Sequence, residues 1–411
     1  MIDLKLARAN PDIFRGALAR KGAAETFDAL LAADRAWAEA TTKRDEARAE
    51  QKRLGKPSSQ EEIDRARALK AELQRLDDEL AAAESERQRL WDAVPNPPHP
   101  SAPDGDTDDD AELVRTWGSP PDLPFEPKDH LDLSGGAIDL ERAARVSGSR
   151  FVYRRGDVAL VELALYRFAL DRLVSRGFEP VLPPVLVRAD AMYGTGFFPA
   201  LREDVYAVPE DGLFLAGTSE VALASMHMGE ELDDLPLRYA GYSTCFRREA
   251  GAAGRDTRGM FRVHQFDKVE MFVFCLPERS EEEHERLLTQ EEEIVQELGI
   301  PYRVMNIAAG ELGPAATRKY DIEGWFPAQA RYRELTSTSN TTDFQARRLN
   351  IRFRREKALE HVHTLNGTAV TARSLIAIME NFQEPDGTIS IPEPLVELGA
   401  PSKLGPERAP A

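Results

Sequence analysis

Residues 246–272 read FRREAGAAGRDTRGMFRVHQFDKVEMF, and this stretch predicts a β-hairpin with a long loop. The apolar positions of its second half share one parity: Phe261, Val263, Val269 and Met271. Alternation of this kind, with charged or polar residues mostly in between, is typical of a strand with one buried face. The middle, 249–259, contains three glycines, Arg255 and Arg258, so we expect a flexible, cationic loop between two antiparallel strands.

The other face of this hairpin is rich in charge. It would hold the following side chains: Arg247, Glu249, Arg262, His264, Phe266 and Glu270. Few structural proteins need such a strand face beside a long loop that carries arginines. Because the arginine fork matches phosphate and carboxylate groups, the hairpin predicts a binding site for a polyanion.

The composition indicates a soluble globular chain of two or three domains, with 411 residues, 42% hydrophobic and 30% charged. A formal charge of −18 argues against non-specific nucleic-acid binding but leaves room for a local basic groove. The two cysteines, Cys245 and Cys275, fit reduced core thiols. No signal peptide or long apolar run is visible, so we expect a cytoplasmic protein without a membrane segment.

The first hundred residues predict an antiparallel coiled-coil hairpin. Residues 27–54 contain neither Gly nor Pro, and one heptad row reads Ala33, Ala40, Ala47 and Leu54. After a break, Ser59 and Glu62 resemble a capping box, and a second heptad row reads Leu69, Leu76, Ala83 and Leu90. The basic residues of the hairpin leave two interpretations open. They form either a solvated coil surface with ion pairs or an arm that contacts an extended anionic partner.

Changes in composition predict the domain boundaries. The helical domain is expected to cover 1–100 and to end in the proline-rich run VPNPPHP. An acidic, proline-rich linker at 101–115 should be exposed and irregular. Residues 116–400 mix helical and strand-like segments, which predicts an α+β domain. Residues 401–411 are expected to form a flexible tail.

Several segments of the second domain lead to candidate site residues. Residues 158–176 have helical periodicity, and the glutamate-rich segment 280–298 is predicted as a surface helix. Residues 193–196, YGTG, are predicted as a turn. A short buried strand at 213–217 leads to Thr218-Ser219-Glu220, where a helix begins. This triplet fits a helix N-cap as well as a binding site.

Two later segments indicate phosphate chemistry. In RELTSTSN, 333–340, Glu334 precedes Ser337 by three residues, and hard oxygens of this kind suit Mg²⁺, although a hydroxyl-rich turn fits equally. Arg373 lies near the start of an apolar helix, 375–381, where it would bind phosphate or reach solvent or a carboxylate. No P-loop or G-x-G-x-x-G motif is present, so arginines on antiparallel strands would have to build a nucleotide site.

Five sequence blocks resemble the bacterial-type seryl-tRNA synthetases, a family of class II aminoacyl-tRNA synthetases. Residues 177–186 are similar to motif 1, 246–270 to motif 2 with its runs RDTRG and HQFDKVE, and 366–373 to motif 3. KYDIEGW at 319–325 and ELTSTSNTTDFQARR at 334–348 are typical of the seryl branch. The resemblance covers essentially the whole chain. It implies a coiled-coil hairpin followed by a class II catalytic domain, in which helices flank an antiparallel sheet.

The resemblance also implies roles for individual residues. Serine would be bound by Thr218, Ser219, Glu220, Arg247, Glu270 and Thr368. ATP would be bound by Arg247, Arg248, Glu249, Val263, Phe266, Glu334, Leu335, Thr336, Ser337 and Arg373. Arg247 and Arg373 would be catalytic, Glu334 and Ser337 would hold Mg²⁺, and Arg255 and Arg258 would meet the acceptor end of tRNA. Arg248 stands where serine is frequent, and the segment 368–373 is shorter than the common spacing.

The implied activity is ATP-dependent attachment of L-serine to tRNA(Ser) through a seryl-adenylate, with selenocysteine tRNA as a further candidate substrate. The implied assembly is a homodimer that needs Mg²⁺ and no zinc. Three alternatives stay open: an enzyme that charges a carrier protein, a paralogue specialised for antibiotic resistance or biosynthesis, and a non-catalytic RNA-binding paralogue. The full hairpin argues against the first, and the presence of Arg247, Glu249, Glu334 and Arg373 argues against the last.

Overall fold

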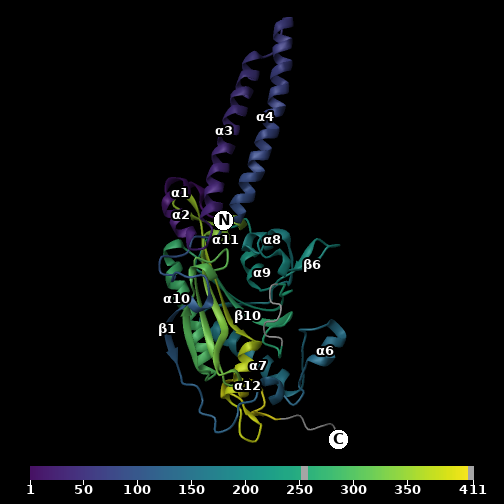
Figure 1. The fold of residues 1–411 in the computed structure, drawn as a ribbon, viewed down its shortest axis with the longest axis vertical. Coiled ribbons are helices and arrows are strands. Elements are labelled where there is room, and N and C mark those ends of the chain that lie inside the picture. Colours follow the sequence, from purple (N-terminus) through teal and green to yellow (C-terminus); the bar gives the residue numbers. More distant parts are fainter. Residues whose placement is uncertain (251–257, 406–411) are drawn as a thin grey trace. The chain divides into compact units, whose positions relative to one another are not determined.

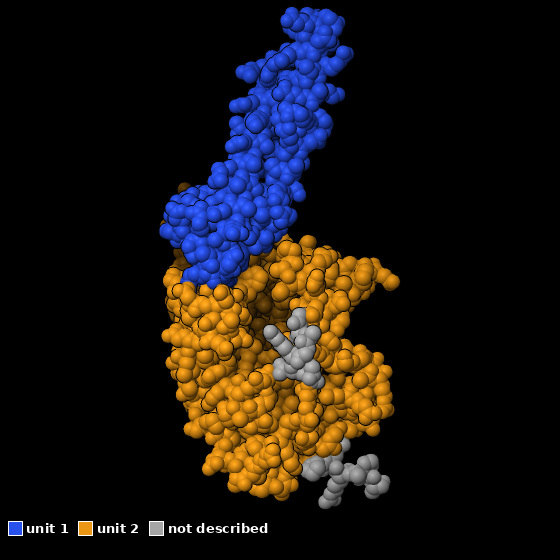
Figure 2. All heavy atoms as spheres, viewed as in Figure 1, with its two compact units in different colours: residues 1–98 blue, residues 99–411 orange. Residues whose placement is uncertain are grey.

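The structure is a computed structural model that describes residues 1–250 and 258–405. The chain divides into two compact units, residues 1–98 and 99–411 (Figure 2). The first is helical and the second combines helices with a large sheet (Figure 1). The predicted fold class, a coiled-coil hairpin with an α+β domain built on an antiparallel sheet, is confirmed.

The first unit is organised by two long antiparallel helices, α3 (Ala24–Leu54) and α4 (Gln60–Ala93), as predicted (Figure 1). The capping box is present, because the Ser59 side chain accepts from the backbone N–H of Glu62 and Glu62 accepts from that of Ser59. A buried row along the seam holds Ala47, Leu69, Leu73 and Leu76. The short helices α1 (Leu4–Ala9) and α2 (Pro11–Ala19) complete a second cluster around Phe27, Leu30 and Leu90.

A buried carboxylate joins these helices. Asp34 is 4% exposed and accepts from Arg8 at 2.5 Å and from Arg87 at 2.7 Å. Burial raises the pKa of Asp34, but the two guanidinium groups outweigh it, so that this pKa is lowered. The Arg87 guanidinium also lies 4.3 Å from the ring centroid of Trp37. A buried charge with two cationic partners holds the base of the hairpin in one arrangement.

The second unit is built on an eight-stranded sheet. Its strand order is β1 (Glu112–Trp117), β11 (Tyr302–Asn306), β12 (Arg318–Phe326), β13 (Arg331–Thr342), β16 (His363–Thr371), β10 (Gln265–Cys275), β9 (Leu237–Phe246) and β4 (Glu179–Val181). All neighbours are antiparallel except β4, which runs parallel to β9. Residues 246–272 therefore connect two adjacent strands of this sheet, from the last residue of β9 into most of β10.

The two faces of β10 serve different purposes. Residues of one parity, Val269, Met271 and Val273, enter the main core. The longest helices that line that core are α7 (Asp157–Ser175), α10 (Ser280–Glu297) and α12 (Ala372–Asn381). On the other parity, Phe272 and Phe274 pack with α9 (Glu220–Ser225) and α11 (Phe344–Leu349). The remaining residues of that second parity, towards the start of β10, face the cavity described below.

Smaller elements surround the sheet. The helices are α5 (His130–Leu133), α6 (Leu140–Ser147), α8 (Ala189–Thr195) and α13 (Glu393–Val396). The strands are β2 (Ile138–Asp139), β3 (Tyr153–Arg154), β5 (Leu186–Arg188), β6 (Tyr206–Val208), β7 (Leu213–Leu215), β8 (Glu231–Leu232), β14 (Arg352–Arg355), β15 (Ala358–His361), β17 (Ile389–Ser390) and β18 (Lys403–Leu404). Among the described residues, no helix is both long and apolar enough to span a membrane.

Two local predictions are wrong. Residues 193–196 do not form a free turn, because Tyr193 to Thr195 end α8 and Gly196 is its left-handed C-cap. The prediction of the glutamate-rich segment 280–298 as a surface helix is wrong for one face of α10, although Glu281, Glu282 and Glu285 on its other face are exposed. In α10 the carboxylates Glu283 and Glu291 are fully buried, and Glu283 meets Arg238 across the sheet edge at 2.5 Å. Composition could not reveal these partners, since they come from distant strands.

Parts of the predicted linker and tail are ordered differently from expectation. Glu112 to Arg115, at the end of the predicted linker, belong to β1, which pairs with β11 at the edge of the sheet. Its six residues are exposed, which is why the segment lacks a buried alternation in the sequence. Near the C-terminus, Lys403 and Leu404 pair with β17.

Candidate active site

A cavity of about 330 Å³ lies over the first half of β10. Most of the predicted site residues line it: Thr218, Glu220, Arg247, Glu249, Val263, Phe266, Glu270, Glu334, Leu335, Ser337, Thr368 and Arg373. They come from the start of α9, both limbs of the hairpin, β13, β16 and the start of α12. The hairpin is shorter in strand than predicted, because β9 ends at Phe246 and β10 begins at Gln265.

The floor of the cavity follows the parity of β10. Phe266, Lys268 and Glu270 point to one side of the sheet, and Lys268 and Glu270 form a buried ion pair. On β16, Thr368 lies opposite Glu270 and its Oγ1 is 3.3 Å from Glu270 Oε2. The register shifts here, since Val269 pairs with Val370, so that Ala369 is the extra residue of a bulge.

A second bulge brings two candidate metal ligands to one face. Glu334 and Ser337 are three residues apart, so a regular strand would point them to opposite faces. On β13, Glu334 pairs with Glu323 but Thr336 pairs with Ile322, which leaves Leu335 as the extra residue. Glu334 and Ser337 therefore both line the cavity.

Glu220 contributes a carboxylate to the lining of the cavity. Its Oε1 accepts from the amide of Gln345 at 2.7 Å and from that of Asn366 at 2.9 Å. Burial and the neighbouring charge of Glu270 raise the pKa of Glu220 to about 7. Since both amide donors converge on one oxygen, the other oxygen has room for an incoming donor.

Two arginines supply positive charge to the same cavity. Arg247 Nε donates to the carbonyl of Gly217 at 3.1 Å, and its guanidinium lies 5.2 Å from the centroid of the Phe266 ring. Arg373, at the start of α12, pairs with Glu334 at 3.2 Å and lies 4.6 Å from the Phe261 ring. One lining thus combines carboxylates with guanidinium groups. This combination of charges suits a ligand with an ammonium group and phosphates.

Three cationic side chains, Arg373, Lys319 and Arg247, act on the carboxylate of Glu334. Enclosure in the cleft opposes its ionisation, but Arg373, Lys319 and Arg247 outweigh that effect and lower the pKa of Glu334. Its side chain is 45% exposed, so the carboxylate faces the open space of the cavity. Within the described residues, no group of three or more His, Cys, Asp or Glu side chains is placed to hold a metal ion.

Four predicted residues lie away from the cavity lining, and one cannot be placed. Ser219 Oγ donates to the carbonyl of Gly241 at 3.4 Å, and Thr336 Oγ1 donates to Glu291 at 3.0 Å on the helix side of the sheet. Arg248 was expected to bind ATP, but it is not part of the lining, and its guanidinium lies 6.0 Å from the Tyr206 ring. Arg258 pairs with Asp129 at 2.7 Å. Arg255 lies outside the described residues.

Arg262, predicted on the charged face of the hairpin, also lines the cavity. Sequence reasoning missed several other residues of the lining: Phe197, Met260, Phe261, Lys268, Lys319, Asn366, Thr371 and Ala372. Lys268 carries a signal that could have found it, because it lies between Phe266 and Glu270 on the same parity. Lys319 and Asn366 reach the cavity through strand pairing across the sheet, for which the sequence offers no comparable signal.

Comparison with known proteins agrees with this geometry. Residues 1–98 match the seryl-tRNA synthetase N-terminal domain, and residues 206–382 match the tRNA synthetase class II core domain (G, H, P, S and T). The serine–tRNA ligase of Streptomyces coelicolor is 48% identical over 411 residues, which cover 96% of each chain. The chain belongs to the seryl-tRNA synthetases. The serine–tRNA ligase of Rhodococcus jostii is 47% identical, over 99% of this chain and all of its relative.

Solved structures of this family superpose closely on the chain. A seryl-tRNA synthetase from Pyrococcus horikoshii complexed with ATP has a TM-score of 0.92 at 41% identity, and the match covers 99% of this chain and 100% of that chain. A cytoplasmic serine–tRNA ligase from Naegleria fowleri in complex with AMP has a TM-score of 0.87 at 32% identity, with coverage of 97% and 96%. As a seryl-tRNA synthetase, the chain is a class II ligase that charges tRNA with serine.

Proposed function

We propose that the cavity over β10 performs both steps of serine attachment to tRNA(Ser). In the first step, the serine carboxylate attacks the α-phosphorus of ATP, and pyrophosphate leaves. In the second, a terminal ribose hydroxyl of tRNA attacks the carbonyl carbon of the seryl-adenylate, and AMP leaves. The observation that supports this proposal is the charged lining of one cavity, which brings together the carboxylates Glu220 and Glu270 and the guanidinium groups of Arg247 and Arg373.

The carboxylates would select serine. Glu220 offers a free oxygen to the substrate ammonium, while Thr368 and Glu270 would hold the small hydroxyl. Ser219 would not contact serine; through its hydrogen bond to the Gly241 carbonyl it would hold the neighbouring residues Thr218 and Glu220 in place. A substrate without the hydroxyl would leave buried polar groups unpaired, which is the strong form of discrimination available to such a site.

The arginines would hold ATP. Arg247 would bridge the α-phosphate and the serine carboxylate, and Arg373 would hold the terminal phosphate. Phe266 would stack on the adenine, while Glu249 and Val263 would contact its edge. Both nucleophiles come from the substrates, so the protein supplies positioning and cationic stabilisation of the phosphate charge. Arg248 and Thr336 lie outside the lining, and we propose that they support the strands that carry Arg247 and Ser337.

The same geometry fits Mg²⁺ as a companion of ATP. Glu334 and Ser337 present two hard oxygens on one face of β13, and the pKa of Glu334 is lowered, so that this carboxyl is available as a carboxylate. When bound, the ion would neutralise phosphate charge. Arg373 would then exchange its contact with Glu334 for one with phosphate.

The proposal also includes two partners of the protein, tRNA(Ser) and a second copy of the chain. The coiled-coil hairpin is the pair of helices α3 and α4. The hairpin would bind the body of tRNA(Ser), and Arg255 and Arg258 would meet its acceptor end in the cytoplasm. A homodimer is favoured by apolar side chains that are exposed on α7 and after β4: Leu160 at 49%, Leu163 at 59% and Leu182 at 80%. Light scattering should give about twice the chain mass of 45.8 kDa.

The deciding experiment is serine-dependent exchange between ATP and pyrophosphate, followed by charging of tRNA(Ser). We expect exchange with serine and at least about 100-fold less with alanine, which would leave the buried polar groups unpaired. Exchange with threonine should also be lower, because the pocket must exclude its extra methyl group sterically. Exchange with another amino acid would refute the assignment of the substrate. Exchange without tRNA charging would favour an enzyme that charges a different acceptor. Charging of selenocysteine tRNA is measured in the same assay.

A further inference from the structure

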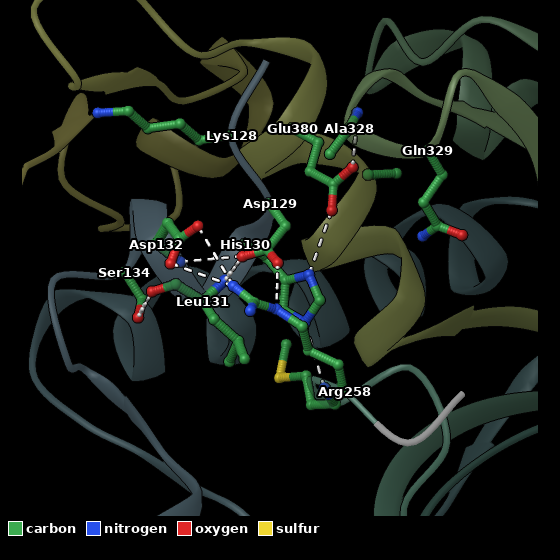
Figure 3. A network of polar contacts seen from close by, with 12 residues as sticks. Lys128, Asp129, His130, Leu131, Asp132, Ser134, Arg258, Ala328, Gln329 and Glu380 are labelled. Carbon is green, nitrogen blue, oxygen red and sulfur yellow. Dashed lines mark hydrogen bonds and ion pairs between the residues drawn. The ribbon is translucent and has the colours of Figure 1, made fainter. Parts of the chain in front are cut away.

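His130, which does not line the cavity, lies at the centre of a buried polar network (Figure 3). The ring is 5% exposed and stands at the first turn of α5. Its Nδ1 is 3.2 Å from Glu380 Oε1, and its Nε2 is 3.2 Å from the backbone nitrogen of Met260. Three segments far apart in the sequence therefore meet at one imidazole.

The geometry fixes the tautomer of this ring. The backbone N–H of Met260 can only donate, so His130 Nε2 must be the unprotonated acceptor. The proton of the neutral ring then lies on Nδ1 and is donated to Glu380. Glu380 is fully buried, and its second oxygen accepts from the backbone N–H of Ala328 at 3.4 Å. Each polar group of the network has a partner suited to that protonation state.

The network is closely packed around the backbone of the second limb of the hairpin. Gly259 has φ of +82°, and a Cβ atom built there would lie 2.3 Å from His130 Nε2. Asp129 caps α5 through two backbone N–H groups and also accepts from Arg258 at 2.7 Å. Arg258 and Met260, on either side of Gly259, are thus bound to two consecutive residues, Asp129 and His130, at the start of α5.

The restrained segment is a wall of the cavity. Residues 260–263 line it, yet they belong to no strand. The Phe261 ring lies between the guanidinium groups of Arg333 and Arg373, at 3.9 and 4.6 Å from its centroid, and Arg373 Nε donates to the Phe261 carbonyl at 3.4 Å. Without strand pairing, the hydrogen bond from Met260 to His130 fixes the backbone at the start of this wall.

One helix connects both sides of the arrangement. α12 carries Arg373 in its first turn and Glu380 near its end. Because His130 is held by Glu380 and holds Met260, the wall is positioned relative to the helix that presents Arg373. We propose that His130 is a positioning residue for ATP: its neutral ring couples α12 to the wall at 260–263. The proposal rests on the function proposed above, in which this wall and Arg373 bind the nucleotide.

Two substitutions separate the halves of the imidazole. His130→Gln keeps an acceptor near the position of Nε2 and loses the Nδ1–H, whereas His130→Asn keeps a donor near Nδ1 and leaves Met260 without its acceptor. His227→Asn is the matched control, because both ring nitrogens of His227 are also within hydrogen-bond distance of partners, Glu230 and Tyr239, but the ring lies in the cluster around Phe274. ATP dissociation constants come from calorimetry, and exchange kinetics and thermal unfolding are measured for each variant.

We expect His130→Asn to raise both the dissociation constant and the KM for ATP about 10-fold, with KM for serine and kcat within about twofold. His130→Gln breaks the link to Glu380 and should raise the same two constants to a similar extent, because the coupling needs both hydrogen bonds, and His227→Asn should not differ from the parent. A loss in only one of the two His130 variants, or equal rises in KM for ATP and serine, would overturn the proposed coupling of α12 to the wall. If the parent shows no serine-dependent exchange, the proposed function fails, but the ATP affinities of the two variants still decide the role of His130.

Discussion

The ionisation of Glu220 should control serine binding near neutral pH. In the proposed complex this carboxylate holds the ammonium group of serine, and only its ionised form can do so. Burial and the charge of Glu270 raise the pKa of Glu220 to about 7, so the group titrates within the working range of the enzyme. The perturbation is a change of pH in the parent and in Glu220→Gln, whose amide does not titrate.

The magnitude follows from that pKa. About nine-tenths of the Glu220 side chains are ionised at about pH 8 and about one-tenth at about pH 6. If only the carboxylate binds the ammonium group, kcat/KM for serine should fall about 10-fold between these values. The KM for ATP should change far less, because the arginines that hold the phosphates keep their charge throughout.

The assay is serine-dependent ATP–pyrophosphate exchange at saturating ATP, measured at half-unit steps of pH. Glu220→Gln should have a low kcat/KM that is flat with pH, since it resembles the protonated parent. If kcat/KM for serine does not change with pH in the parent, or if it falls at low pH in Glu220→Gln as well, the assignment of Glu220 to the ammonium group is refuted. If the KM for ATP changes with pH by a similar factor, a group other than Glu220 is responsible for the pH dependence.

The same raised pKa predicts an effect on stability in the absence of serine. A carboxyl whose folded pKa lies above its unfolded value stabilises the fold at low pH, and this contribution is lost as pH rises from about 4.5 to about 7. For Glu220 the loss amounts to about 3 kcal/mol in the free energy of unfolding. Denaturant titrations at about pH 8 should show a higher free energy of unfolding for Glu220→Gln than for the parent. Saturating serine should reduce this difference, because it binds the ionised carboxylate of the parent.

Three further predictions follow from the two units. Arg373→Ala should lower exchange at least about 100-fold while the melting temperature stays near that of the parent, because in the proposed complex the side chain binds phosphate, and it lies in the cavity lining and not in the core. Replacing residues 46–77 by a short turn should spare exchange and abolish tRNA charging, since the base cluster around Phe27 and Leu90 is retained; equal loss of both activities would count against the hairpin as a tRNA arm. Phe272→Ala should cost about 3–5 kcal/mol in unfolding free energy, because Phe272 is fully buried in the sheet.

The sequence was most informative where local periodicity decides the structure. The heptad rows predicted both long helices, and the capping box at Ser59 and Glu62 located the start of the second. Parity along β10 separated the core residues Val269 and Met271 from the cavity residues Phe266 and Glu270. Local patterns succeed in these segments because neighbours in sequence are also the neighbours that determine burial.

Local patterns failed where partners come from distant segments. The carboxylates of α10 suggested a solvent face, yet Glu283 is neutralised by Arg238 and Glu291 accepts from Thr336. Lys268 was overlooked although its parity was visible, because a lysine inside a sheet is expected only where a carboxylate such as Glu270 meets it. Such pairings depend on strand order, which single-sequence periodicity does not contain.

The two β-bulges explain why the site as a whole could be predicted only from a resemblance. Counted along an unbroken strand, Glu334 and Ser337 would face opposite sides of the sheet, and so would Thr368 and Thr371. The extra residues Leu335 and Ala369 reverse the parity halfway along each strand, so that all four side chains line one cavity. A one-residue deletion within either strand would therefore turn half of that strand's site residues into the core without changing the hydrophobic pattern elsewhere. The register of β13 and β16, and not only the identity of their residues, holds the serine and ATP parts of the site together.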